Sequence, residues 1–230
     1  NALKLALGVT AAAAVFGSTS SVVYAEALTQ AERDAMTPEQ VLAQLKAGNQ
    51  RFLAGQAQAH DYLAQKRASA DGQYPAAVIL SCIDSRAPAE ILLDTGIGEA
   101  FNARIAGNIA NSDLIGSLEF ACAAAGAKVV LVMGHTACGA VRGAIDGVKL
   151  GSLTGLLDKI KPAIEATQYN GDRTGKNDAF VDAVATSNVL HTISELRNGS
   201  EVLANLEKSG AIKIVGSMYD LKTGVVTFIS

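Results

Sequence analysis

The chain has 230 residues, of which 49% are hydrophobic and 18% are charged, and its formal net charge at pH 7 is -3. This composition is typical of a globular protein that buries a full core and excludes a disordered chain. The sequence has no basic cluster with interleaved aromatic residues, which excludes nucleic acid as a partner and favours a small-molecule substrate.

The N-terminal stretch has the anatomy of a secretory signal peptide. Lys4 precedes an apolar run over residues 5–17, and the small residues Val23 and Ala25 precede an expected cleavage point. The apolar run is too short and too rich in alanine for a membrane span. We therefore predict a signal peptide over residues 1–25 and a periplasmic or secreted protein with no stable membrane insertion after processing. An apolar helix that stays attached is the alternative.

Residues 26–230 contain no internal repeat, low-complexity tract or long linker, so we expect one domain. Caps and apolar residues at helical spacing predict helices at about residues 37–55, 62–70, 112–125, 137–147, 153–166, 177–197 and 200–208. The apolar runs AAVILS, EAFNARI and KVVLVMG are typical of buried strands. Two further β runs joined by DLKTG indicate a C-terminal hairpin or edge strand. This alternation predicts an α/β fold with a mainly parallel central sheet flanked by helices.

Two motifs follow predicted strands, where ligands of parallel sheets bind. The first apolar run ends at Cys82, and the third ends in HTAC, which contains His135 and Cys138. A His-x-x-Cys unit and a distant cysteine supply three nitrogen and sulfur ligands, the set that tetrahedral zinc prefers. The sequence therefore predicts a zinc site. Core or capping residues without a metal are the alternative for either motif alone.

Asp84 and Arg86 follow the first cysteine at alternate positions. Zinc with two thiolates and a neutral imidazole is formally neutral, so it withdraws less charge from a bound water than a site of three histidines does. Asp84 can accept a hydrogen bond from that water, and Arg86 can hold the carboxylate in a bidentate pair that lowers its pKa. The alternatives are Asp84 as the fourth ligand of a closed site, or a plain salt bridge within a loop.

The order CIDSR and then HTAC resembles the β-class carbonic anhydrases, and the resemblance covers most of the chain after the leader. It implies that Cys82, His135 and Cys138 are zinc ligands and that Asp84 and Arg86 form the catalytic dyad. It also implies reversible hydration of CO₂ to bicarbonate, and an intertwined homodimer or a tetramer with the active site at the subunit interface.

Finer features of the resemblance concern the substrate pocket. Gln73 and Phe101 match a polar and an aromatic residue of that pocket, with a surface glutamine and a core phenylalanine as alternatives. Gln73 precedes the strand that ends at Cys82, which places it roughly 20 Å from the zinc of its own chain. We therefore expect Gln73 and Phe101 to line the zinc of a partner chain. Ile105 and Phe120 replace an asparagine and a tyrosine of the family, which removes any polar contact of those side chains.

Several other residues have no predicted direct role in zinc binding or catalysis. Ile79 and Ala87 stand where the bicarbonate-inhibited subgroup has tryptophan and valine, so the resemblance favours the open, uninhibited type. Cys122 lies in a small-residue helical stretch and is expected to be a compact apolar filler. His60 and His191 have no ligand-type neighbours in the sequence. We interpret His191 as a packing or surface residue within a helix, and His60 as a surface residue that could carry protons.

Two other functions compete with CO₂ hydration. Hydrolases of carbonyl sulfide and carbon disulfide resemble the same family closely and would share the zinc site. A non-catalytic protein stabilised by a closed Cys/Asp/His/Cys zinc site would show no activity at all.

Overall fold

The computed structural model describes residues 27–229, so the predicted leader lies outside the described residues. A five-stranded sheet has the order β2-β1-β3-β4-β5, with β1 Ala77–Ser81, β2 Ala100–Arg104, β3 Val129–His135, β4 Lys213–Tyr219 and β5 Val226–Ile229. The first four strands are parallel, and β5 runs antiparallel to β4. The predicted α/β class and the C-terminal pair of β runs are therefore confirmed.

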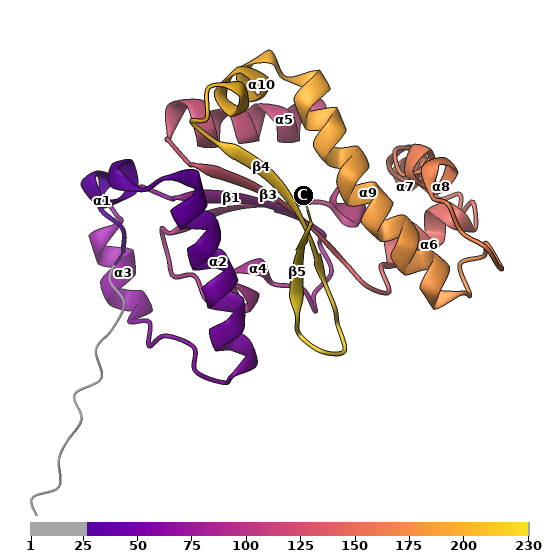
Figure 1. The fold of residues 1–230 in the computed structure, drawn as a ribbon, viewed down its shortest axis with the longest axis horizontal. Helices are drawn as coiled ribbons and strands as arrows, with labels where there is room; N and C mark the ends of the chain where they lie inside the picture. The colour runs from indigo at the N-terminus through magenta and orange to yellow at the C-terminus, as the bar shows by residue number, and fades with distance from the viewer. Residues whose placement is uncertain (1–26, 230) are drawn as a thin grey trace, which may run out of the picture.

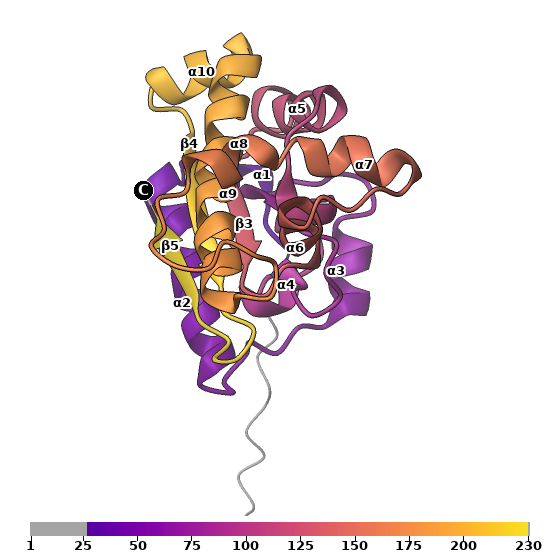
Figure 2. The ribbon, with the colours of Figure 1, turned by 90° about the vertical axis from the view of Figure 1, so that its right-hand side faces the viewer.

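Helices lie against both faces of the sheet (Figures 1 and 2). The N-terminal half contributes α1 Gln30–Ala35, α2 Pro38–Leu53, α3 Tyr62–Ala68, α4 Ala89–Leu92, the short 3₁₀ turn η1 Ala106–Asn108, α5 Ser112–Glu119 and the π turn η2 Phe120–Ala124. The C-terminal half contributes α6 Gly139–Ile145, α7 Gly151–Asp158, α8 Lys161–Ala166, α9 Asp178–Gly199 and α10 Glu201–Lys208. None of the helices between residues 27 and 229 combines the length and apolar character needed to cross a membrane.

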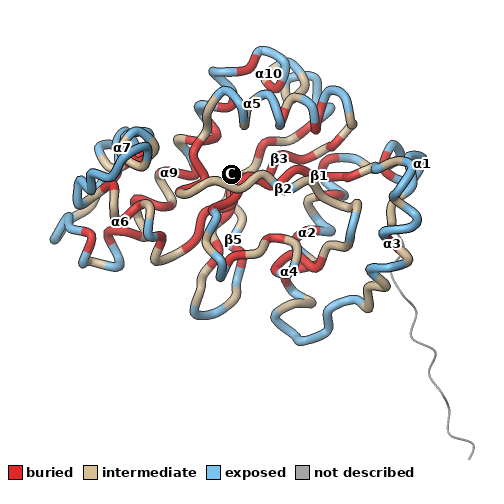
Figure 3. The backbone as a smooth tube through the Cα atoms, turned by 180° about the vertical axis from the view of Figure 1, so that it is seen from behind, coloured by how far each residue is buried: buried red, intermediate tan, exposed pale blue. Residues whose placement is uncertain are grey.

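Alternate residues of the central strands pack into two cores, one on each face of the sheet. Ile79 of β1 packs with Leu45 of α2 and Leu92 of α4, whereas Leu80 packs with Leu118 of α5 and Leu196 of α9. Both faces are covered, so β1 and β3 are buried along their whole length, as Figure 3 shows in red. A strand buried on both faces is encoded by a continuous apolar run, which is why these strands are visible in the sequence.

The predicted helix over residues 153–166 is two helices. Pro162 has no N–H to continue an α-helix and lies in the first turn of α8, and α7 ends before it at Asp158. By contrast, the predicted start at residue 37 is confirmed, because Thr37 accepts a hydrogen bond from the N–H of Gln40 and caps α2.

Candidate metal centre

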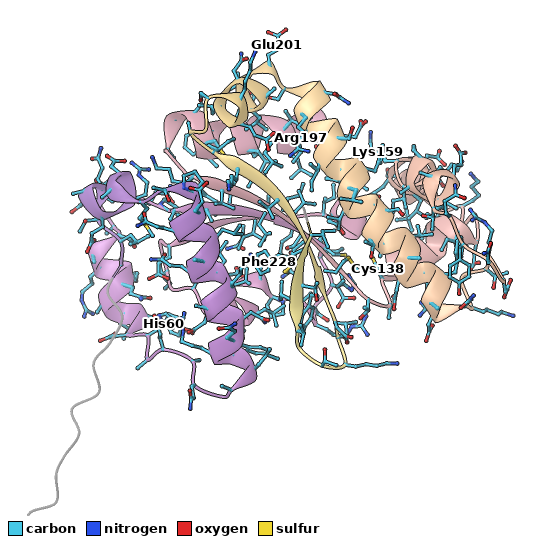
Figure 4. The ribbon with its side chains drawn as sticks, in the orientation of Figure 1. His60, Cys138, Lys159, Arg197, Glu201 and Phe228 are labelled. Atoms are coloured by element: carbon cyan, nitrogen blue, oxygen red, sulfur yellow. The ribbon has the colours of Figure 1, made fainter. Side chains whose placement is uncertain are left out.

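Neighbouring strands bring the two motifs together. Cys82 directly follows β1, and His135 is the last residue of β3, which pairs with β1 in parallel register. Cys138 is the N-cap residue of α6 and lies beside α9 (Figure 4). The sulfur atoms of both cysteines and a ring nitrogen of His135 lie within 4.8 Å of one another, and all three residues are buried. This is the one group of metal-ligand type found among residues 27–229.

The donor atoms of this group fit a zinc ion. The Nδ1 atom of His135 lies 2.9 Å from the carbonyl oxygen of Thr136, which can only accept, so Nδ1 carries the proton and Nε2 carries the lone pair. This buried Nε2 has no hydrogen-bond partner among the described residues. Ligand bonds of 2.0–2.3 Å place the donor atoms of tetrahedral zinc about 3.3–3.8 Å apart, which is compatible with the observed spacing.

The two thiols of the group differ in protonation. A hydrogen bond with Cys138 lowers the pKa of Cys82, while the same contact and burial raise the pKa of Cys138, because one sulfur holds the proton that stabilises the other as a thiolate. The backbone N–H of Gly107 also donates to the Cys82 sulfur, at 3.3 Å. Thiolate character at Cys82 suits metal binding, since a cysteine ligand binds in its deprotonated form.

Asp84 lies at the edge of this group and forms the expected pair with Arg86. The Nε and Nη2 atoms of Arg86 donate to the two carboxylate oxygens of Asp84 at 3.0 and 2.8 Å. These hydrogen bonds lower the pKa of Asp84 to about 2, so the carboxylate is ionised at neutral pH. One of its oxygens lies 3.8 Å from Nε2 of His135. An ionised acceptor therefore faces the candidate metal position.

Three residues that the sequence reasoning did not identify hold the backbone around this site. Arg104 donates to the carbonyl oxygens of Cys82 and Asp84, at 2.8 and 2.6 Å. On α9, Asp182 accepts from the N–H of Ala137, and Asn188 donates to the carbonyl of Gly107. Polar residues on an otherwise apolar helix face are a signal of such roles, but their partners are too distant in the chain to be read from the sequence.

The conformation of Gly107 favours a glycine. Its φ is +68°, and a Cβ at this position would lie 2.7 Å from the side chain of Ile160. Its N–H donates to the Cys82 sulfur, and its carbonyl accepts from the Asn188 side chain. The turn η1 is thus fixed between the Cys82 sulfur and α9.

Gln73 and Phe101 do not lie near the candidate ligands of the same chain. Gln73 is exposed and precedes β1, at the opposite end of the strand from Cys82. Phe101 pairs with Val78, which is four residues from Cys82 and therefore about 13 Å away along the strand. Phe101 contacts the 56% exposed Phe120 across 6.1 Å between ring centroids, and both line a hollow of about 570 Å³ beside edge strand β2.

The structure also shows the environments of His60, Ile105 and Cys122. His60 is not a surface residue, because only 5% of its side chain is exposed, and it lies 3.3 Å from a carboxylate oxygen of Asp94. Ile105 packs against the apolar cores, so the family asparagine is replaced here by a packing residue. Cys82, Cys122 and Cys138 form no disulfide, and Cys122 is buried in an apolar core, as expected of a filler.

Comparison with known proteins gives one consistent family. Residues 77–226 match the family described as carbonic anhydrase. Carbonic anhydrase 2 of Mycobacterium tuberculosis is 35% identical over 186 residues, which cover 78% of this chain and 87% of that protein. The carbonic anhydrase of Mycolicibacterium smegmatis is 34% identical over 184 residues, with 79% and 88% coverage.

Solved structures show the same fold. A β-carbonic anhydrase of Aspergillus fumigatus superposes with a TM-score of 0.64 at 24% identity, covering 82% of this chain and 90% of the other. One of two tetrameric β-carbonic anhydrases of Sordaria macrospora gives a TM-score of 0.62, also at 24% identity, with 70% and 83% coverage. From these matches and the order of its motifs, this chain belongs to the β class of the carbonic anhydrase family of enzymes.

Proposed function

We propose that this chain catalyses the reversible hydration of CO₂ to bicarbonate and a proton, at a zinc ion held by Cys82, His135 and Cys138. The observation that carries the proposal is the buried nitrogen and sulfur group, whose histidine Nε2 has no other partner within residues 27–229, beside an ionised Asp84. The general activity of the family agrees with this chemistry.

The protein residues orient the reacting water and hold the site in position. Zinc supplies Lewis acidity that activates water near neutral pH. Asp84 accepts a hydrogen bond from the attacking water and orients it, and the Arg86 fork keeps Asp84 ionised and fixed in direction. Arg104 holds the backbone between Cys82 and Asp84, so that ligand and acceptor keep their relative positions.

We also propose that the site is of the open type, with Asp84 outside the zinc coordination sphere. Both carboxylate oxygens are engaged by Arg86, so Asp84 would lose this pair in order to become a fourth ligand. Ile79 and Ala87, both buried in the core, also differ from the tryptophan and valine of the bicarbonate-inhibited subgroup, which favours the open type.

The second copy of the chain completes the substrate pocket in this proposal. CO₂ is small and nonpolar, so it needs an apolar wall, and bicarbonate needs a polar group that orients it. Phe101 and Gln73 supply these two functions in trans, since they lie at the far end of the strands from their own ligands. The unpaired edge of β2 and the apolar hollow beside it are suited to burial against a partner. A homodimer is the smallest such assembly.

The experiment is a stopped-flow assay of CO₂ hydration on zinc-loaded protein near pH 8, combined with metal analysis. Cys82→Ser should lose zinc and activity, while the matched control Cys122→Ser should keep both. Asp84→Asn should keep zinc but lower turnover about 100-fold or more, because it removes a charged acceptor. Full zinc and activity in Cys82→Ser would contradict the assignment. Zinc binding without activity would indicate a structural site, and faster turnover of carbonyl sulfide would reassign the substrate.

For localisation, we propose export to the periplasm or outside the cell, with cleavage after Ala25. The support is the composition of residues 1–25, which resembles a signal peptide. Amino-terminal sequencing of the protein recovered from the periplasm should begin at Glu26. Recovery in the cytosol with these residues intact would reverse the proposal.

A further inference from the structure

The turn between the ligands His135 and Cys138 contains a residue in a disfavoured conformation. Only Thr136 and Ala137 separate the last residue of β3 from the N-cap of α6. Ala137 has a φ of +52°, in the left-handed region, where a Cβ is crowded by the backbone. Such a conformation persists only where surrounding contacts enforce it.

The contacts that enforce this turn come from three directions. The N–H of Thr136 donates to the carbonyl of Tyr219 at 2.9 Å, and its hydroxyl accepts from the N–H of Leu221 at 3.0 Å. The carbonyl of Thr136 accepts from the ring of His135. The N–H of Ala137 itself donates to Oδ1 of Asp182 at 2.7 Å, a short charge-assisted hydrogen bond. Asp182 is therefore the side chain that holds the strained residue.

Asp182 lies on a face of α9 that also reaches the other ligand segment. Asp182, Ala185, Asn188 and Thr192 follow one another at intervals that place them on one side of a helix. Asn188 donates to the carbonyl of Gly107 at 2.7 Å, and Thr192 donates to that of Asn108 at 3.1 Å. One rigid helix thus fixes both the turn of His135 and Cys138 and the turn that donates to Cys82.

We infer that Asp182 is a positioning residue of the metal centre, which acts by holding Ala137 in the left-handed conformation and so fixing the Cys138 sulfur relative to His135. The inference rests on the proposed function only in taking these residues as zinc ligands. Without the carboxylate, Ala137 relaxes to a negative φ, the peptide that joins it to Cys138 rotates, and the sulfur leaves its position. Asp182 is not a ligand itself, since it lies outside the group that surrounds the metal position.

The test is a set of zinc dissociation constants, measured by competition with a chromophoric chelator. Asp182→Ala should weaken zinc binding about 10- to 100-fold, as loss of a residue that orients a ligand does. Asp182→Asn should stay within about threefold of the wild type, because the amide oxygen still accepts from the N–H of Ala137. Introducing Ala137→Gly into Asp182→Ala should restore binding, since glycine adopts a positive φ without crowding.

A matched control removes a similar hydrogen bond away from the site. Asp146 accepts from the N–H of Gly175 at 2.9 Å, so Asp146→Ala should leave zinc affinity unchanged. Should Asp182→Ala not fold, Ala137→Val decides instead, because a β-branched residue opposes the left-handed conformation while Asp182 remains. It should weaken zinc binding, and the absorption bands of its cobalt(II) form should shift.

The outcomes separate this inference from the proposed function. If the wild type binds no zinc, both fail. If it binds zinc and Asp182→Ala or Ala137→Val binds equally well, the positioning role alone is overturned. It is also overturned if Ala137→Gly gives no rescue, or if Asp182→Asn is as weak as Asp182→Ala, since the negative charge would then matter rather than the backbone conformation.

Discussion

Among single residues, Cys122 is the cysteine that lies outside the candidate metal centre. It lies in the apolar core formed by η2, the sheet and α10, and only 5% of it is exposed. Burial raises the pKa of Cys122 to about 12, because the apolar surroundings disfavour a thiolate. The residue is therefore a neutral thiol at any pH at which the protein is assayed.

This protonation state predicts that Cys122 resists alkylation. The reactive form of cysteine is the thiolate, so at pH 8, well below the pKa, iodoacetamide should leave Cys122 unmodified in the folded protein. In urea the same residue should react as fast as a free cysteine. Peptide mass spectrometry after timed alkylation measures both rates. Rapid modification of Cys122 in the folded chain would contradict its assignment to the core.

The sequence predicted the group of Cys82, His135 and Cys138 and the Asp84/Arg86 pair, but not the residues that hold them in place. The candidate ligands and the Asp84/Arg86 pair lie in two short motifs, and each motif follows an apolar run that predicts a strand. Asp182 and Asn188 act through contacts with residues far away in the chain, which no local pattern encodes. His60 was misjudged for the same reason, because its neighbour Asp94 comes from a distant segment.

At the scale of elements, α2 is joined to the segment after α4 by a buried carboxylate. Asp94 has a side chain that is 3% exposed and lies 2.5 Å from Nε of Arg51 in α2. Burial alone raises the pKa of Asp94, but hydrogen bonds from Arg51, the N–H of Gln58 and His60 leave it lowered. A lowered pKa in the folded state stabilises the protein above the unfolded-state pKa, and this contribution is lost as the pH falls through the folded value.

We predict that Arg51→Ala destabilises the protein by about 2 kcal/mol at pH 7, because it leaves a buried carboxylate without its cation. Arg51 is one of the groups that lower the pKa of Asp94, so in this variant the pKa is higher than in the wild type and the carboxyl is protonated at a higher pH. The loss relative to the wild type should therefore shrink between pH 7 and pH 4.5. Urea unfolding at both pH values measures it.

The control for this prediction is an exposed ion pair. Lys161→Ala breaks a surface pair in which Nζ of Lys161 lies 2.7 Å from Oδ1 of Asp158, and it should leave the urea midpoint almost unchanged at either pH. If Arg51→Ala lowers the stability as little as this control, or by the same amount at both pH values, the charge of Asp94 is not stabilised by Arg51.

Elements were predicted well where one physical signal dominates. The buried strands β1 and β3 are continuous apolar runs, and α2 has a capping residue, a proline at its start and helical apolar spacing. The short helices α1 and α4 were not predicted. In α4, four residues are too few to show a helical period, and its position is set by packing of Leu92 and its neighbours against α2.

In the proposed dimer, we predict that each active site takes its zinc-binding residues from one chain and Gln73 from the other. The homodimers of Gln73→Ala and of Cys82→Ser should both be poorly active. A mixed dimer of these chains contains one site in which an intact zinc group meets an intact glutamine of the partner. Its CO₂-hydration rate, measured after affinity purification on two different tags, should approach half that of the wild type.

The control mixes Gln73→Ala with a Gln73→Ala/Cys82→Ser double variant, in which no site combines both groups. This assembly should stay at or below the activity of the Gln73→Ala homodimer. If the first mixed dimer is no more active than this control, Gln73 acts within its own chain or not at all.

The placement of α9 against both ligand turns has a consequence for the dynamics of the chain. Asp182 and Asn188 join the helix to each turn, so an opening fluctuation of α9 also disrupts the candidate metal centre, and we expect the two to behave as one cooperative unit. Zinc should therefore slow amide hydrogen exchange throughout the buried part of α9, although the helix provides no ligand. The effect should be smaller in α2, on the opposite face of the sheet. Exchange rates measured with and without added zinc would thus reveal which parts of the molecule unfold together.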